Sequence, residues 1–264
     1  MKVINLVAVV LFILLSSFSS WLIYNVSEFS QPFPMQAIPV RFDYLAFVQN
    51  WQISGCLNKT CVITPGENFT IHGLWPELKN GSSVIFCKAE PFDKQNISDL
   101  DLKLKGELKI LWASLYKKDV YKFWKHEWEK HGGCTGLRQD EYFRAGYDLR
   151  KTYDFLDYLE KNGIRPGDHA SVDNITKALE AGISDAVGKK VENIVHTKCI
   201  NAGGKHVLYE IVLCLDKNRT PKECPTRCRR RPLFPAKSDL PSPPPLPSIA
   251  GTVATDNSSL LQAY

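Results

Sequence analysis

The sequence lacks several features that would assign it to a common class of protein. Its longest nearly unbroken apolar run, Val3 to Leu15, is interrupted only by Asn5 and spans about 13 residues, which is short for a membrane-spanning helix. Its cysteines and histidines do not form the close-set ligand pairs of a structural zinc site, because the tight cysteine spacings are C-x4-C and C-x3-C without paired histidines nearby. No internal repeat is visible. The 264 residues, 44% of them apolar, are therefore expected to fold around one hydrophobic core.

Strong charge is also missing. The formal net charge is +5, and terminal segments account for more than half of it, which leaves roughly +2 for the central part of the chain. Such a balance permits an anionic partner but does not demand one. The basic cluster that ends at Arg231 could contact RNA or a membrane, although a solvated run of charge is the simpler interpretation.

The N-terminus has the pattern of a secretory signal peptide. Lys2 precedes the apolar run, and small residues follow from Ser16 to Ser20. We predict residues 1–24 as the signal segment, with cleavage between about residues 20 and 27. The alternative is an uncleaved anchor, because Trp21 to Tyr24 could extend the apolar run. The expected location is extracellular, without stable membrane association.

Secretion makes the eight cysteines interpretable. An even number of cysteines in an oxidising compartment predicts four disulfides, although eight cysteines allow 105 pairings and the residues alone do not choose among them. N-x-S/T sequons also suggest an exported glycoprotein. Six of them lie in the expected folded region: Asn58, Asn68, Asn80, Asn96, Asn174 and Asn218.

Helical and strand patterns are grouped along the chain rather than regularly alternating, which predicts an α+β fold. The expected strands are residues 42–53, 68–75, 193–199 and 205–215. The expected helices are residues 98–116, 120–131, 140–161 and 171–187. We place the folded domain at residues 38–232. Residues 233–264 are rich in proline and are predicted to be a disordered or polyproline-like tail.

The stretch FWKHEWEKHGGC, residues 123–134, concentrates groups that can do chemistry. His126 and His131 are five positions apart, which separates them by about 140° on a helix, so they do not chelate one metal as neighbours. Glu127, Lys130 and His131 share one edge, at spacings of three and four residues. A salt-bridged amphipathic helix is the alternative interpretation.

A second stretch, HGLWP at residues 72–76, changes this balance. Phe69 and Ile71 alternate with His72, so His72 is expected to face away from the apolar side of its strand. Taken alone, His72 could be a core histidine at a strand end. Cleaving RNA without a metal, however, requires two proton-transfer groups, and the pKa of histidine suits both tasks. Lys130 as the cation that stabilises the phosphorane and Trp75 as the aromatic ring that stacks a base complete the set with His72 and His131.

The two stretches together resemble the active-site signatures of the secreted ribonuclease T2 family. FTIHGLWPE and FWKHEWEKHGGC occur in the family's order, and the resemblance extends over residues 41–230. It implies an α+β fold with an antiparallel sheet packed against several helices. It also implies cleavage of single-stranded RNA to 2′,3′-cyclic phosphate ends, without a metal or other cofactor and as a monomer.

The resemblance assigns roles by position. His72 corresponds to the proton donor for the leaving group and His131 to the base. Glu127 and Lys130 correspond to the pair that supports the phosphorane. The implied substrate-binding residues are Gln49, Trp75, Phe123 and His126.

The cysteine order resembles the plant pattern of the family. The implied disulfides are Cys56–Cys61, Cys87–Cys134, Cys199–Cys228 and Cys214–Cys224. One departure is Gly133, where the family usually has threonine or serine before the cysteine, and loss of that hydroxyl could loosen the end of the helix.

Within the family the sequence looks most like the plant S-ribonucleases, basic pistil glycoproteins of self-incompatibility. That resemblance implies pollen F-box proteins as partners. An S-like ribonuclease for phosphate scavenging, senescence or defence is the alternative. A catalytically silent secreted glycoprotein that acts by binding or storage is an alternative of another class.

Overall fold

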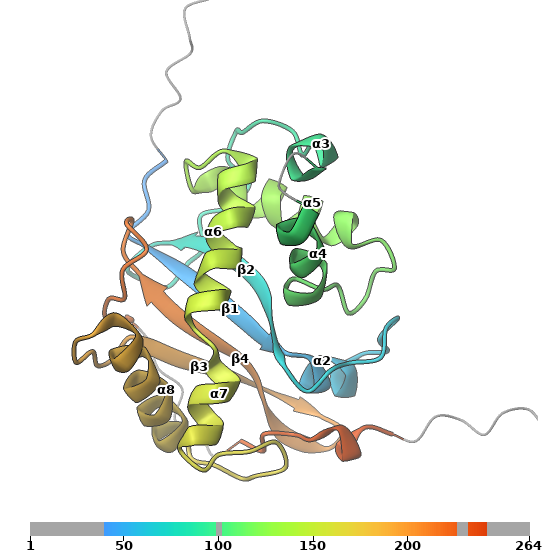
Figure 1. The fold of residues 1–264 in the computed structure, drawn as a ribbon, viewed down its shortest axis with the longest axis vertical. Coiled ribbons are helices and arrows are strands. Elements are labelled where there is room, and N and C mark those ends of the chain that lie inside the picture. Colours follow the sequence, from blue (N-terminus) through green and yellow to red (C-terminus); the bar gives the residue numbers. More distant parts are fainter. Residues whose placement is uncertain (1–39, 99–101, 226–231, 242–264) are drawn as a thin grey trace, which may run out of the picture. The chain divides into compact units, whose positions relative to one another are not determined.

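The structure, a computed structural model, describes residues 40–98, 102–225 and 232–241 (Figure 1). Within them, four antiparallel strands form one sheet in the order β2-β1-β4-β3. The strands are β1 (Tyr44–Trp51), β2 (Phe69–Glu77), β3 (Val195–Ala202) and β4 (Lys205–Leu215). One helix lies in the sequence between β1 and β2, and the other described α-helices lie between β2 and β3. The predicted α+β class with an antiparallel sheet is therefore confirmed.

The helices differ from the sequence prediction mainly at their ends. They are α2 (Gln52–Asn58), α3 (Lys94–Ser98), α4 (Leu102–Leu111), α5 (Val120–Lys130), α6 (Gln139–Thr152), α7 (Phe155–Lys161) and α8 (Val172–Val187). Short 3-10 turns are η1 (Gly132–Cys134) and η2 (Lys237–Asp239). No described helix is long and apolar enough to cross a membrane.

Three predicted elements are wrong in extent. The strand predicted over 42–53 ends at Trp51, because α2 begins at the next residue. The helix predicted over 98–116 is α4, which ends at Leu111. The helix predicted over 140–161 is broken after Thr152, where Asp154 caps α7 by accepting a hydrogen bond from the backbone N–H of Asp157. Capping competes with helix continuation, and hydrophobic periodicity alone does not reveal it.

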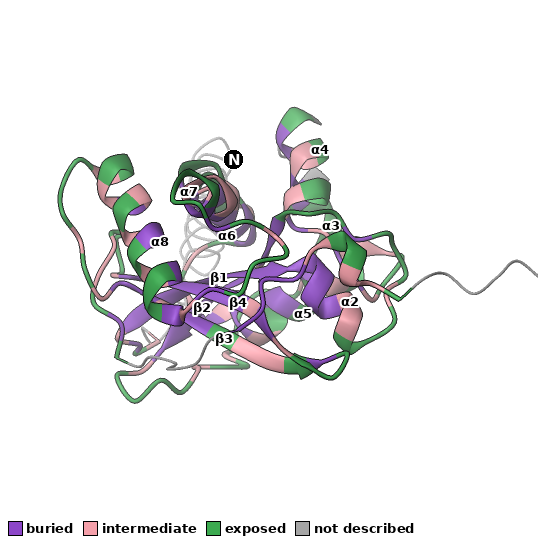
Figure 2. Cartoon of the chain, turned by 90° about the horizontal axis from the view of Figure 1, so that it is seen from below, coloured by how far each residue is buried: buried purple, intermediate pink, exposed green. Residues whose placement is uncertain are grey.

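The main core lies between the sheet and its helices, and Figure 2 shows β1 and β4 buried almost throughout, with α6, α7 and α8 on the same side of the sheet. Aromatic residues dominate this core. Trp51, Phe69 and Phe234 contact one another with ring centroids 4.6–5.8 Å apart. A smaller buried cluster on the opposite face includes Val48, Trp75 and Val212.

The tail predicted from residue 233 begins too early. Leu233 and Phe234 are buried, and the backbone of Leu233 pairs with β4 by hydrogen bonds to His206 and Leu208. The indole N–H of Trp51 donates to the carbonyl of Pro235 at 2.8 Å. Because composition revealed the prolines but not these contacts, the packed part was missed; it continues to Leu240, which packs against the core. Residues 242–264 lie outside the described residues, as does the predicted signal segment.

Three of the four predicted disulfides are formed: Cys56–Cys61, Cys87–Cys134 and Cys214–Cys224. The fourth was predicted to join Cys199 to Cys228, and Cys228 lies outside the described residues. The Cys87–Cys134 bridge joins the loop after β2 to η1, which follows α5.

Candidate active site

His72 is held at a distortion in β2. The pairing with β1 runs Val48 to Gly73 and then Gln49 to Ile71, so His72 is the extra residue of a β-bulge. A bulge redirects a side chain and is common beside active sites. The His72 side chain is 28% exposed and lines the cleft, facing away from the core face, as the alternation in the sequence predicted.

Two side chains form hydrogen bonds with the backbone of β2 at this bulge. The indole N–H of Trp112 donates to the carbonyl of His72 at 3.0 Å, and the backbone N–H of Leu74 donates to the hydroxyl of Tyr142 at 3.3 Å. Both Trp112 and Tyr142 are fully buried. The position of the His72 backbone is therefore tied to the core.

The other catalytic candidates come from α5, which begins at the N-cap Asp119. Trp124 and Trp128 bury one face of this helix in the core. Glu127 and His131 are also buried, at 2% and 3% exposure, but they lie toward the cleft. His131 is the C-cap residue, just beyond the end of α5, and both side chains line the cleft.

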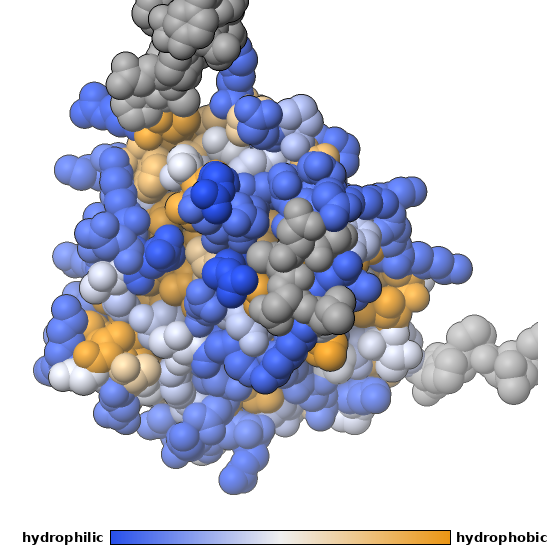
Figure 3. All heavy atoms as spheres, turned by 45° about the horizontal axis from the view of Figure 1, so that its top comes forward, coloured by the Kyte–Doolittle hydropathy of each residue, from blue (hydrophilic) through white to orange (hydrophobic). Residues whose placement is uncertain are grey.

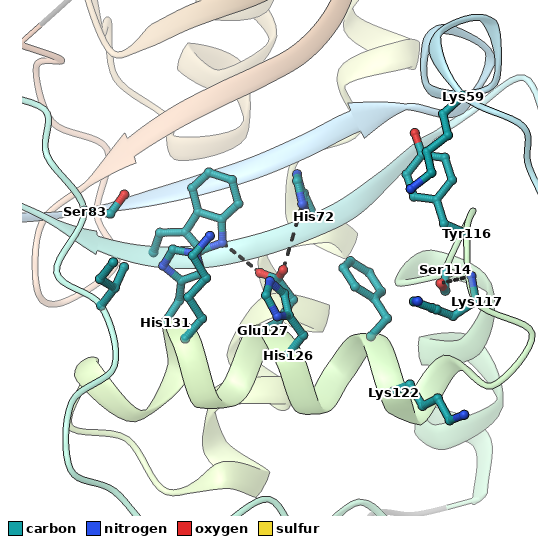
Figure 4. Close-up of a pocket in the computed structure, with 14 residues that line it drawn as sticks. Lys59, His72, Ser83, Ser114, Tyr116, Lys117, Lys122, His126, Glu127 and His131 are labelled. Carbon is teal, nitrogen blue, oxygen red and sulfur yellow. Dashed lines mark hydrogen bonds and ion pairs between the residues drawn. The ribbon is translucent and has the colours of Figure 1, made fainter.

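The cleft between β2 and α5 has a volume of about 720 Å³. Figure 4 shows His126, Glu127 and His131 extending from α5 toward β2, where His72 projects between the two elements. Lys59, Lys117 and Lys122 lie toward one end, and Ser83 lies toward the other. The lining residues are Lys59, His72, Trp75, Ser83, Ile85, Ser114, Tyr116, Lys117, Lys122, Phe123, His126, Glu127, Lys130 and His131. Glu127 is the single carboxylate among these described residues, against four lysines.

Trp75 joins the two histidines. Its ring lies 4.9 Å from the His72 ring, edge to face, and 4.8 Å from the His131 ring, nearly parallel. Its indole N–H donates to Glu127 Oε2 at 2.9 Å. Trp75 lines the cleft but is only 8% exposed and stacks on His131, so its contact with a nucleobase stays a prediction.

Two carboxylates surround His72. Its Nδ1 lies 2.6 Å from Glu210 Oε1, and its Nε2 lies 3.9 Å from Glu127 Oε1. Burial alone lowers the pKa of His72, but the hydrogen bond and charge of Glu210, helped by the charge of Glu127, outweigh it and raise that pKa above its ordinary value. Burial raises the pKa of Glu127 in spite of the neighbouring cations and the bond from Trp75.

His131 has the opposite surroundings. Burial, assisted by the positive charges of Lys130 and the other nearby cations, lowers the pKa of His131 to about 3. Within the described part of the chain, its Nδ1 is buried without a hydrogen-bond partner. His131 is therefore neutral near pH 7 and can accept a proton, whereas His72 is biased toward its protonated form.

Comparison with known proteins agrees with this arrangement. The family model described as "Ribonuclease T2 family" matches residues 42–224. The chain belongs to the ribonuclease T2 family. It is an endoribonuclease of that type.

Two curated plant relatives are similar along most of this ribonuclease. Intracellular ribonuclease LX of Solanum lycopersicum is 36% identical over 191 residues, 67% of this chain and 74% of the relative. Ribonuclease S-2 of Pyrus pyrifolia is 30% identical over 189 residues, 68% of this chain and 80% of the relative. The solved structure of ribonuclease MC1 from bitter gourd seeds has a TM-score of 0.64 at 31% identity, with 73% of this chain and all of that chain covered.

Gln49 does not take the place that the sequence predicted for it in this ribonuclease. Its side chain is fully buried, and its Nε2 donates to the carbonyl of Tyr153 at 3.2 Å. It is not among the residues that line the cleft, so its contact with a nucleobase stays a prediction that this structure does not support. Phe123 does line the cleft, half-buried, and Tyr116 is a second half-buried ring there. These two rings are the accessible aromatic surfaces of the site.

Other residues of the ribonuclease site were missed by the sequence analysis. Glu210 and Lys198 reach His72 and Trp75 from β4 and β3, which lie outside both signatures. The only sequence signal for Glu210 was a charged residue inside a mostly apolar segment, and Lys198 had none, because β3 also contains other polar residues. No cluster of three metal-binding side chains occurs within the described residues.

Proposed function

We propose that this endoribonuclease cleaves single-stranded RNA by attack of the ribose 2′-OH on the adjacent phosphorus, which gives a 2′,3′-cyclic phosphate. The observation that carries the proposal is the pair of histidines on either side of Trp75, with pKa values moved in opposite directions. Two groups with divergent pKa values in one cleft are the arrangement that acid–base catalysis requires.

The proton transfers follow from the two environments. Neutral His131 removes the proton of the 2′-OH as the oxygen bonds to phosphorus. Protonated His72 gives its proton to the 5′-oxygen as the phosphorus–oxygen bond breaks. The enzyme ends with His131 protonated and His72 neutral, so one proton has crossed the site and must return before the next turnover.

The remaining cleft residues bind the phosphate and a base. Lys130 and His126 supply positive charge where negative charge grows on the phosphorane oxygens. Glu127 lies between the histidines, where it holds Trp75 and supports the charged form of His72. Phe123, whose ring centroid is 6.0 Å from that of His72, is placed to stack a base next to the reacting phosphate.

An assay of products tests this function. Purified, oxidised protein is incubated with single-stranded RNA, duplex RNA and DNA, with and without EDTA, and the ends are identified by mass spectrometry. We expect cyclic-phosphate ends from single-stranded RNA, undiminished by EDTA, and intact DNA, because DNA lacks the 2′-OH. A protein without RNA-cleaving activity, as a binding or storage protein would be, or activity that requires a metal, contradicts the proposal.

Secretion is proposed on the signal-peptide pattern, the disulfides and the sequons. All six sequon asparagines in the folded region are exposed, so each is accessible to glycosylation. Similarity does not decide the location, because the relatives include one named intracellular and one named extracellular ribonuclease. The test is N-terminal sequencing and glycan mapping of protein from native tissue: a cleaved N-terminus between residues 20 and 27 with occupied sequons supports export.

For the biological role we propose a pistil S-ribonuclease, with pollen F-box proteins as partners, on the resemblance of the signatures and the similarity to ribonuclease S-2. The alternative is an S-like role in phosphate scavenging, senescence or defence, and the chain is also similar to a relative that is not named an S-ribonuclease, intracellular ribonuclease LX. Expression confined to the style with many alleles supports the first role. Induction in starved or ageing tissue with one uniform sequence contradicts it.

A further inference from the structure

Glu210 is a buried carboxylate at the centre of β4, outside both active-site signatures. It is 3% exposed and lies opposite Lys198 of the neighbouring strand β3. Its Oε2 is 3.2 Å from Lys198 Nζ, and its Oε1 is 2.6 Å from His72 Nδ1. Although β4 lies two strands away from β2 in the sheet, the carboxylate of Glu210 therefore contacts the imidazole of His72, which is proposed to protonate the leaving group.

Lys198 closes this arrangement on its other side. Its ammonium group lies 4.9 Å from the centroid of the Trp75 ring, and the same ring contacts both histidines. Glu210, Lys198, Trp75 and His72 therefore form a closed ring of contacts behind the cleft. We call these four residues the His72 support.

We propose that Glu210 is a positioning residue that binds His72 through Nδ1, so that the proton to be donated is on Nε2. Lys198 partly neutralises the negative charge of Glu210. With Nδ1 engaged by Glu210, Nε2 is the nitrogen on the side of Glu127 and the cleft. This inference rests on the proposed role of His72 as the proton donor. A carboxylate bonded to the far nitrogen of a catalytic histidine fixes its tautomer and ring orientation in this way.

The charges around the pair act in defined directions. Burial raises the pKa of Glu210, but its bonds to His72 and Lys198 outweigh burial and lower that pKa below its ordinary value. Glu210 raises the pKa of His72 and Lys198 lowers it, while Glu127 from α5 also raises it. His196 on β3 and the phenols Tyr116 and Tyr209 are the other titratable groups in the field of Glu210.

A purely structural ion pair is the competing explanation, because a buried pair of this kind also occurs without a catalytic role. The two explanations differ in the sign of their effects. If the support tunes His72, removing the charge of Glu210 and removing the charge of Lys198 must move the titration of His72 in opposite directions. A structural pair would make both variants less stable and leave the titration unmoved.

The experiment compares Glu210→Gln, Lys198→Met and the control Glu107→Gln in the full chain. Glu107 is also a carboxylate paired with a lysine, but on α4, away from the cleft. The titration of His72 is followed by NMR, with its resonance assigned by comparison with His72→Asn, and kcat/KM on RNA is measured over pH. We expect Glu210→Gln to shift the His72 titration and the basic limb of kcat/KM to lower pH, with a loss of roughly ten- to a hundredfold on that limb. Lys198→Met is expected to shift both to higher pH, and Glu107→Gln to shift neither.

Unchanged titration of His72, or shifts of the same sign in both variants, overturns the inference. If Glu210→Gln does not fold, the test uses Glu210→Asp and Lys198→Met. Because the shorter carboxylate of Glu210→Asp keeps its charge, the pKa of His72 should stay close to that of the wild type, whereas kcat/KM should fall. Failure of the proposed function can be distinguished from failure of this inference. In the first case the wild-type protein would not cleave RNA, while the NMR titration would still report whether Glu210 shifts the pKa of His72.

Discussion

At the scale of single residues, the surroundings of the two histidines lead to a prediction for the pH dependence of catalysis. The acid His72 must be protonated, and its pKa is raised, so kcat/KM should fall only as the pH rises through a value above the ordinary one for histidine. The base His131 must be neutral, and its pKa is about 3, so activity should persist well into the acidic range. Protonation of Glu127 contributes to the acidic limb, because its pKa is raised by burial.

The measurement is kcat/KM against pH on a dinucleotide substrate, which reports groups of the free enzyme. His131→Gln should lower kcat/KM at every pH rather than shift the pH at which it falls. A bell centred on the ordinary pKa of histidine, with both limbs close to it, would contradict the assignment of opposite environments.

Gly133, the departure from the family signature, has its own local explanation. A Cβ at this position would lie 2.6 Å from Ala89 Cβ. The loop that carries Ala89 is held on both sides, by the Cys87–Cys134 bridge and by the hydrogen bond from Trp128 to Glu90. A nearby hydroxyl is still present after α5: the Thr135 side chain donates to the carbonyl of Gly132 at 2.6 Å.

We therefore expect Gly133→Thr, which restores the usual family residue, to leave activity unimproved and to lower the free energy of unfolding by roughly 1–3 kcal/mol through overpacking. Urea denaturation measures the change. The double variant Gly133→Thr with Ala89→Gly should regain most of the loss. A Gly133→Thr protein that is both more stable and more active would show that the missing hydroxyl matters after all.

The limits of the sequence analysis are clearest for individual residues. Chemistry and spacing identified His72, His131 and Glu127, because a helical angle and a strand alternation are local quantities. They did not reveal that the Trp75 face is occupied by His131, or that Glu210 reaches His72 across the sheet. Those facts depend on strand order, which no local pattern contains.

At the scale of elements, the catalytic geometry depends on how closely β2 approaches α5, and Gly73 sets that distance. A Cβ on Gly73 would collide with Trp75 Nε1 and Glu127 Oε2, the two atoms that bond the strand to the helix. The glycine after His72 is therefore explained by close approach.

Gly73→Ala should break the bond between Trp75 and Glu127 and reduce kcat/KM by about ten- to a thousandfold, because misplacement of catalytic groups by an ångström is costly. The indole N–H resonance of Trp75 reports the bond directly. The matched control is Gly106→Ala in α4, where a Cβ meets nothing within 4 Å. Equal activity of the two variants would refute this account of the glycine.

The helices also show why element ends were harder to predict than element types. The apolar periodicity continues through Tyr153, yet α6 ends at Thr152 because Asp154 begins a new helix. Similarly, α2 follows β1 without a turn residue between them. A short capping residue or a direct junction leaves little trace in a hydrophobic pattern.

At the scale of the whole molecule, residues 233–240, which the sequence analysis assigned to the tail, pack against the core of the described domain. Phe234 is fully buried and its ring contacts Trp51 and Phe69. Its backbone N–H donates to the carbonyl of Asp168, and its carbonyl accepts from the N–H of Gly167. On the face drawn in Figure 3, hydrophilic residues predominate, with apolar patches between them. Among the described residues, the exposed large apolar side chains are Val62, Ile63, Ile85, Phe86 and Ile110.

Phe234→Ala in the full chain should lower the free energy of unfolding by about 3–5 kcal/mol, because it leaves a cavity in the aromatic core. The control Phe86→Ala removes a phenylalanine that is 67% exposed and should cost roughly 0.5 kcal/mol or less. Both are measured by urea denaturation of oxidised protein. Equal stability of the two variants would mean that the segment from residue 233 does not belong to the core.

The division of labour between the two histidines is most directly tested with a substrate that needs no general acid. Uridine 3′-(4-nitrophenyl phosphate) has a leaving group that departs as a stable anion, so protonation by His72 becomes unnecessary, while the 2′-OH must still be deprotonated. On RNA, His72→Ala and His131→Ala should each lose on the order of 100- to 10,000-fold in kcat. On the nitrophenyl ester, His72→Ala should recover to near the wild-type rate, and His131→Ala should remain impaired. Equal losses on both substrates, or recovery of His131→Ala instead, would contradict the account.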